Sequence, residues 1–133
     1  MLTYYLIPPT EQEVDYDHPA GTLHISFGGI YFFLYPYLLQ VKDKTGQMLD
    51  PQYNAKFTAE MFPVVLDELN EARKAAESSP ALIVVHVGKQ ITPTAKELYE
   101  NVSRSDLLKF IDSLIALFED TASKNCSLYL TEY

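Results

Sequence analysis

Several features that would tie a chain to a membrane or to an oxidising compartment are missing from this sequence. It contains a single cysteine, Cys126, so no internal disulfide bond can form, as is typical of a reducing compartment. It has no run of about 18 apolar residues, which argues against a membrane-spanning helix. Its N-terminus has no basic segment of the kind that begins a secretory signal. We therefore expect a cytoplasmic protein that does not associate with membranes.

Basic side chains are also missing from the first third of the chain. Residues 1–41 contain no lysine or arginine, and the whole chain has 18 acidic and 10 basic residues, a formal net charge of −8. Such a segment repels phosphate groups, so we expect no nucleic-acid partner. It suits a basic partner protein, although negative charge also serves simply to keep a protein in solution.

The composition is otherwise that of an ordinary globular protein. The 133 residues are 47% hydrophobic and 21% charged, which is enough to bury a core and too apolar for disorder. No internal repeat, low-complexity tract or linker interrupts the sequence. Residues 1–133 are therefore expected to form one domain.

Aromatic residues crowd into one stretch, SFGGIYFFLYPYLLQ, at residues 26–40. Strand-like runs flank Gly28-Gly29, a pair that favours a tight β-hairpin because glycine adopts positive φ without a steric clash. The apolar residues also fall at helical spacing, but Pro36 would then sit inside a helix at a cost of about 3 kcal/mol. Pro36 suits the first position of a helix instead. We predict a strand up to Tyr35 and a helix from Pro36 to Thr45.

Hydrophobic periodicity predicts the remaining elements. The segment 81–88 is almost wholly apolar, which indicates a strand buried on both faces. This strand and the last one are joined by a helix and could pair in parallel. The order predicts an α+β fold, a two-layer sandwich with a mixed, mainly antiparallel sheet, an N-terminal Gly-Gly hairpin and helices on one face. Further strands are expected at 2–7 and 126–133, and further helices at 63–79, 94–101 and 103–125.

The predicted aromatic strand would place Tyr31, Phe33 and Tyr35 on one face. Three interpretations of this face are open: it belongs to the core, it forms a protein interface, or it lines a ligand pocket. Tyrosine suits an interface because its ring is apolar while its hydroxyl can stay hydrated. A homodimer in which this strand packs on its symmetry mate is one form of such an interface.

A run of acidic residues, EQEVDYDHP, precedes this region. Clustered carboxylates can bind a hard cation, can steer a basic partner protein, or can simply be solvated. The spacing matches no metal-binding loop, so we assign no metal site and take the run as a candidate partner-binding surface. We call residues 11–18 the acidic loop, and its carboxylates belong to Glu11, Glu13, Asp15 and Asp17.

Three other side chains could carry chemistry: His24, His86 and Cys126. A cysteine and a histidine can act as nucleophile and base, whereas a histidine in a strand can be a hydrogen-bonded structural residue. No local signature flanks Cys126, and the sequence has no G-x-S-x-G elbow, no phosphate-binding glycine loop and no Cys/His zinc spacing. We predict no catalytic residue and no cofactor, with a small enzyme or ligand-binding domain as the alternative.

Three segments resemble a group of small uncharacterised bacterial proteins: GGIYFFLYPYLLQVKDKTGQMLD, PALIVVHVG and DLLKFIDSLIALFEDTASKNCSLYL. The resemblance covers most of residues 20–131 and implies an aromatic hairpin, a helix, a V-H-V-G strand and a C-terminal helix and strand. More loosely, small acidic proteins of this layout are similar to immunity proteins, which bind and neutralise a toxin. The resemblance implies a non-enzymatic protein-binding module, and this is the function that we expect.

Overall fold

A four-stranded antiparallel sheet forms one layer of the computed structural model, which describes residues 1–132. The strand order is β2-β1-β6-β3, so the N-terminal and C-terminal strands lie side by side at the centre of the sheet. Their register places Leu2 opposite Glu132 and Ile7 opposite Ser127. The strands are β1 (Leu2–Ile7), β2 (Gly21–Leu23), β3 (Ala55–Phe57) and β6 (Ser127–Glu132).

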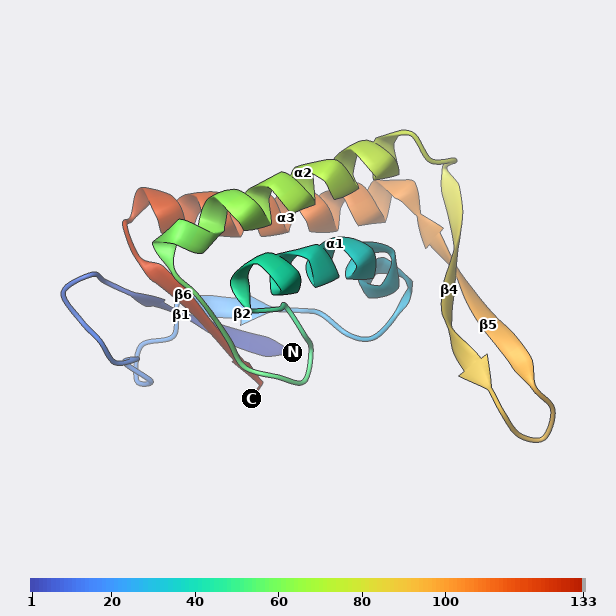
Figure 1. The fold of residues 1–133 in the computed structure, drawn as a ribbon, viewed down its shortest axis with the longest axis horizontal. Helices are drawn as coiled ribbons and strands as arrows, with labels where there is room; N and C mark the ends of the chain where they lie inside the picture. Colours follow the sequence, from blue (N-terminus) through green and yellow to red (C-terminus); the bar gives the residue numbers. More distant parts are fainter. Residues whose placement is uncertain (133) are drawn as a thin grey trace.

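Three α-helices cover one face of this sheet (Figure 1). Leu2 and Leu128 from the sheet are fully buried, as are Leu69 from the second helix and Ile111 from the third. The core therefore lies between the helices and the sheet, as the α+β prediction with helices on one face requires. The helices are α1 (Gly29–Thr45), α2 (Phe62–Glu77) and α3 (Arg104–Ser123), with a 3-10 turn, η1 (Ala59–Met61), before α2.

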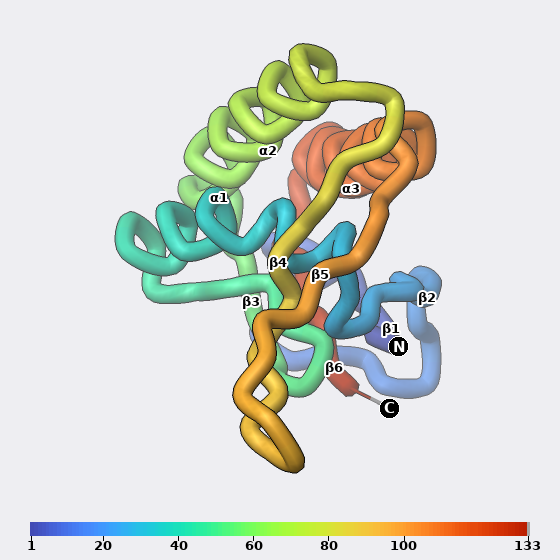
Figure 2. The backbone as a smooth tube through the Cα atoms, turned by 90° about the vertical axis from the view of Figure 1, so that its right-hand side faces the viewer, coloured from blue at the N-terminus to red at the C-terminus, as the bar shows by residue number. Residues whose placement is uncertain are grey.

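Two strands form a separate antiparallel ribbon that projects from the body between α2 and α3 (Figure 1). They are β4 (Leu82–Gln90) and β5 (Lys96–Ser103), and we call residues 82–103 the arm. The view in Figure 2 places the arm in front of α1, with β4 and β5 side by side. The arm and the acidic loop lie at opposite ends of the molecule (Figure 1).

Several local signals in the sequence are confirmed. Gly46 ends α1 with φ of 79°, and Asn125 has φ of 59° just beyond α3. Ser103 caps α3, since its Oγ accepts a hydrogen bond from the backbone N–H of Asp106. The inner face of α2 is buried, and it includes Val65, Leu69, Ala72 and Ala76.

The predicted Gly-Gly hairpin is wrong, because α1 begins at Gly29 and continues through Pro36. Tyr31, Leu34 and Leu38 are buried on one side of this helix, and their burial offsets the hydrogen bond that the proline cannot donate. Pro36 itself is exposed, so water can bond to the carbonyl that its missing N–H leaves free.

The prediction of a strand at 81–88 buried on both faces is also wrong. Leu82 and Val84 are exposed, because β4 belongs to the two-stranded arm rather than to the middle of a sheet. Residues 94–101, predicted as a helix, lie mostly in β5. The strands β4 and β6 lie in different sheets, so they do not pair. Every strand pair in the two sheets is antiparallel, so neither sheet is mixed.

Across residues 1–132, the three helices are each too short or too polar to cross a membrane.

Candidate functional site

Backbone hydrogen bonds order the acidic loop and its two ends. The backbone N–H of Glu11 donates to Pro8 O at 3.0 Å and closes a turn just after β1, and that of Ala20 donates to Tyr4 O in β1 at 2.8 Å. Between them, the backbone N–H of His18 donates to Asp15 O at 3.2 Å and closes a second turn. The loop therefore has a defined backbone path even though most of its side chains are exposed.

Tyr16 anchors the middle of the loop on the sheet face that the helices leave open. Its ring lies edge-on to Tyr5 with ring centroids 5.4 Å apart, and 6.3 Å from the ring of Tyr129. Tyr5 and Tyr129 face each other across the β1–β6 pair, so strand pairing brings them together. A hydrogen bond to Tyr129 raises the pKa of Tyr16. We call Tyr5, Tyr16 and Tyr129 the tyrosine cluster.

A cavity of about 240 Å³ adjoins the tyrosine cluster. Tyr5 and Tyr16 form part of its wall, and the remainder comes from the edge of the sheet and the end of the loop. The ring faces and hydroxyls of the cluster make this cavity partly apolar and partly hydrogen-bonding. Its other lining residues are Thr3, Pro19, Gly21 and Thr22.

The carboxylates of the acidic loop have two kinds of surroundings. Asp15 Oδ2 lies 2.8 Å from His18 Nδ1, and Asp15 Oδ1 accepts a 3.1 Å hydrogen bond from the backbone N–H of Asp17. The bond to His18 lowers the pKa of Asp15. Glu11, Glu13 and Asp17 are exposed, and within residues 1–132 none of them pairs with a lysine or arginine. Over the same residues, no three His, Cys, Asp or Glu side chains gather as a metal site.

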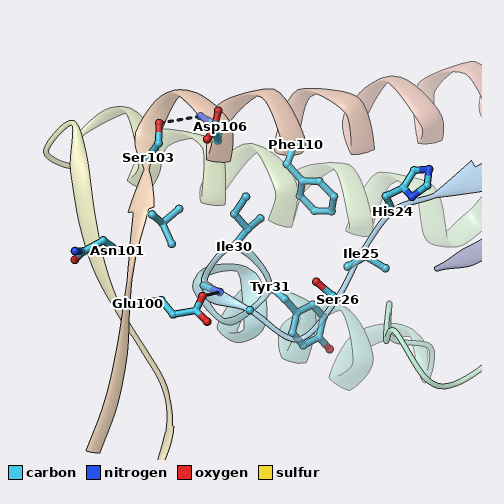
Figure 3. Close-up of a pocket in the computed structure, with 13 residues that line it drawn as sticks. His24, Ile25, Ser26, Ile30, Tyr31, Glu100, Asn101, Ser103, Asp106 and Phe110 are labelled. Carbon is cyan, nitrogen blue, oxygen red and sulfur yellow. Dashed lines mark hydrogen bonds between the residues drawn. The ribbon is translucent and has the colours of Figure 1, made fainter.

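A second cavity, of about 320 Å³, lies where the arm meets the body (Figure 3). It is bounded by the start of α1, by β5, by the first turns of α3 and by the segment after β2. Figure 3 shows the side chain of Glu100 directed toward the start of α1 and that of Asn101 directed to the other side of β5. Ile30 and Phe110 contribute apolar walls, and His24 lies at the far end.

Two polar side chains of this second cavity, those of Glu100 and Ser103, hold the fold together. Glu100 Oε2 accepts a 2.7 Å hydrogen bond from the backbone N–H of Gly29, and Ser103 Oγ serves as the cap of α3. A Cβ at position 29 would overlap Val102 Cγ2, so glycine permits the close approach of α1 to β5. The cavity is therefore a structural junction in which the carboxylate of Glu100 already has a partner.

The three aromatic residues proposed as one face are placed differently by the helix. Tyr31 is buried and its hydroxyl donates a 3.1 Å hydrogen bond to Leu49 O, so it belongs to the core. Burial raises the pKa of Tyr31. Phe33 is half-buried and stacks on Tyr37, whereas Tyr35 is exposed. The three side chains therefore do not share one surface.

The three candidate chemical side chains lie on separate elements. His24 borders the second cavity, and His86 Nε2 lies 2.5 Å from Glu97 Oε2 on the exposed side of the arm. Cys126 is buried beyond the end of α3, where its Sγ bonds to Lys124 O. Since α3 has 20 residues and so spans about 30 Å, Cys126 is remote from the cavity at the other end of this helix. A ligand-binding site that uses His24 would have to lie in the second cavity, without His86 or Cys126. Such a site stays a prediction.

Two parts of the candidate site were missed by sequence reasoning. Tyr5 and Tyr129 lie in strands that the sequence predicts correctly. A single sequence does not indicate that these two strands pair. Glu100 was assigned to a helix, which hid its role at Gly29. The segment KELYENV has no period-two alternation of apolar and polar residues, so no hydrophobic pattern indicated a strand there.

Comparison with known proteins adds no name to this site: no family model, no curated protein and no solved structure matches the chain.

Proposed function

We propose that this protein is a non-enzymatic protein-binding module that binds a basic partner protein through the acidic loop. One observation carries the proposal. The loop is held in place by Tyr16, yet three of its carboxylates are exposed and, in the described part of the chain, lack a basic neighbour. A surface that is already ordered loses little conformational entropy on binding. Its carboxylates, which have no basic neighbour, speed the encounter with a partner of opposite charge.

The tyrosine cluster supplies the second element of recognition. A lysine or arginine side chain gains about 0.5–2 kcal/mol from an aromatic face within about 6 Å. The cavity of about 240 Å³ beside Tyr5 and Tyr16 offers space for one such side chain. Among residues 1–132, no carboxylate lines this cavity, so the exposed carboxylates of the loop would attract the cationic partner and the rings would contact its side chain. Charge and ring face together favour a basic protein over a neutral one.

A basic toxin is the partner that we propose, following the resemblance to immunity proteins. An inhibitor of this kind needs an ordered surface with charge opposite to that of its target, and needs no catalytic group of its own. The acidic loop and the tyrosine cluster meet that requirement. The resemblance is an analogy of layout, so the test has to address the surface directly.

The test compares two variants with the same net charge. The first, E11Q/E13Q/D17N, removes three carboxylates from the acidic loop. The second, D43N/D67N/E119Q, removes three exposed carboxylates from α1, α2 and α3. Each variant and the natural protein are immobilised and exposed to an extract of the native host at low salt, and retained proteins are identified by mass spectrometry.

We expect a basic protein to be retained by the natural protein and by the helix variant, to be released by salt, and to be absent from the loop variant. With that protein purified, titration calorimetry should show affinity reduced about tenfold or more by the loop substitutions. Equal retention by both variants would overturn the proposal, as would retention of acidic or neutral proteins only.

A further inference from the structure

The arm presents a face that does not contact the body. In an antiparallel pair, residues opposite one another point to the same side, and the register pairs Val84 with Asn101 and His86 with Tyr99. With Leu82, these side chains form what we call the outer face of the arm. The opposite side chains, Ile83, Val85 and Val102, are buried in the core cluster.

Large apolar side chains on the outer face are open to solvent. Leu82 is 57% exposed, Val84 is 65% exposed and Tyr99 is 59% exposed. These three lie within one short two-stranded ribbon, whereas single exposed apolar residues are common on any surface. A two-stranded ribbon is only marginally stable alone, and a contiguous apolar face of this kind marks a surface that is covered in the working form of the protein.

We propose that a second copy of this chain covers the outer face, so that two arms pack face to face about a twofold axis. Charge favours a copy over another partner. Residues 82–103 hold two lysines, Lys89 and Lys96, and two glutamates, Glu97 and Glu100, so the arm is formally neutral in a chain of net charge −8. The charges on the outer face itself also balance, because Glu97 lies opposite Lys89 in the register and its Oε2 lies 2.5 Å from His86 Nε2.

A neutral arm lets two strongly acidic chains meet where their repulsion is weakest. The acidic loops lie at the far ends of the two molecules, away from the axis (Figure 1). A basic partner, by contrast, would be drawn to the loop and not to the outer face, where opposite charges balance. The twofold axis also gives each apolar side chain an equivalent apolar surface, because an isologous interface uses the same patch on both chains.

The outer face supplies part of the interface that a stable dimer needs. Standard interfaces use about 20–30 residues a side. The arm has 9 residues in β4 and 8 in β5, and about half of them point to the outer face because side chains alternate along a strand, so the turn between the strands has to contribute as well. Ile91 in that turn is 77% exposed and extends the apolar surface beyond the strands. The dimer would carry one acidic loop at each end and so present two binding surfaces at once.

The test is the mass in solution. Sedimentation equilibrium between about 1 and 100 µM covers the range in which an interface of this size associates. We expect the natural protein to approach twice its chain mass of 15.1 kDa. Val84→Glu buries two charges in the interface and should weaken the dimer by more than about a hundredfold. Val84→Thr keeps the β-branched shape and should weaken it about tenfold.

A matched control separates the arm from charge in general. Tyr53 is 68% exposed but lies in the segment before β3, so Tyr53→Glu should leave the dimer intact. The loop variant E11Q/E13Q/D17N should also remain dimeric, which keeps this proposal distinct from partner binding. Circular dichroism verifies that each variant is folded. A natural protein that stays at 15.1 kDa throughout, or a folded Val84→Glu variant that stays dimeric, would overturn the proposal.

Discussion

The carboxylate of Glu100 holds the N-terminus of α1, because its Oε2 accepts a 2.7 Å hydrogen bond from the backbone N–H of Gly29. Gly28, at the cap position, has no side chain that could do this. The negative charge also lies at the positive end of the helix dipole. One side chain therefore joins the root of the arm to the first turn of a helix 71 positions earlier in the chain.

Replacing Glu100 by alanine should lower the free energy of unfolding by about 1–2 kcal/mol, since a helix cap and a charge-assisted hydrogen bond are both lost. Glu97→Ala, which removes the exposed partner of His86 on the same strand, should change it by less than about 0.5 kcal/mol. Urea denaturation measures both. Equal effects would mean that Glu100 acts only through strand propensity.

Gly29→Ala should destabilise the protein by about 1–3 kcal/mol, although alanine is the better helix former. The added Cβ would overlap Val102 Cγ2 and push β5 away from α1. At Gly28 the nearest atom to an added Cβ is Glu100 Oε2, at 3.6 Å, so Gly28→Ala provides the control and should cost only the preference of a cap position for glycine over alanine, less than Gly29→Ala. Thermal unfolding of the two variants side by side gives the comparison.

Tyr31→Phe should lower the free energy of unfolding by about 1–2 kcal/mol, because the buried carbonyl of Leu49 loses its donor. Tyr35→Phe, at an exposed ring, should have no measurable effect on stability. Chemical denaturation distinguishes them. A result in which Tyr35 matters and Tyr31 does not would restore the interpretation of this aromatic stretch as an exposed interface.

The same residue predicts a dependence on alkaline pH. Burial raises the pKa of Tyr31 above its ordinary value of 10.0, so the folded state keeps a proton that the unfolded state loses. This contribution to stability is fully present below pH 10 and is lost as the pH rises further. Tyr31→Phe should therefore reduce the slope of unfolding free energy against pH above 10, measured by urea titration at several pH values.

In the acidic loop, the bond from His18 lowers the pKa of Asp15, so His18→Ala should raise that pKa toward its ordinary value of 3.8. The stability from this pair is present above pH 3.8 and is lost as the pH falls through the lowered pKa. Carbon-13 NMR titration of the Asp15 carboxyl measures the change. His24→Ala serves as the control, because His24 lies at the second cavity and should leave Asp15 unaffected.

Sequence reasoning succeeded where local pattern and tertiary packing agree. Both α2 and α3 have a long apolar stripe, and α3 has a serine cap, so the periodicity that predicts them is also the face they bury. The acidic loop was likewise predicted correctly to be a loop, because it is rich in charge and is flanked by prolines and a glycine. The α+β class with helices on one face follows from these elements.

The stretch around Pro36 could not be predicted from local rules. Proline disfavours a helix interior by about 3 kcal/mol, but burying a single leucine side chain contributes about 1.5–3 kcal/mol, and α1 buries Leu34 and Leu38 as well as Tyr31. The glycine pair predicts a turn by local rules. Glycine is needed at position 29 because Val102, on a strand that is distant in sequence, leaves no space for a Cβ there.

The arm could not be predicted because an apolar run normally indicates burial. LIVVHVG has no charge on either face, so the sequence alone places it inside a sheet. The structure instead leaves Leu82 and Val84 exposed, and only another surface could cover them. The hydrophobic pattern of one sequence cannot indicate whether an apolar face is covered by its own fold or by another molecule.

The central position of β6 has a consequence for synthesis. This strand lies between β1 and β3, and its register with β1 joins the second residue of the chain to the last described one. The sheet can therefore assemble only after residues 127–132 have left the ribosome, and β1 has no strand partner on that side until then. Contacts this distant in sequence slow folding. We expect the nascent chain to form its helices early and to complete its sheet last.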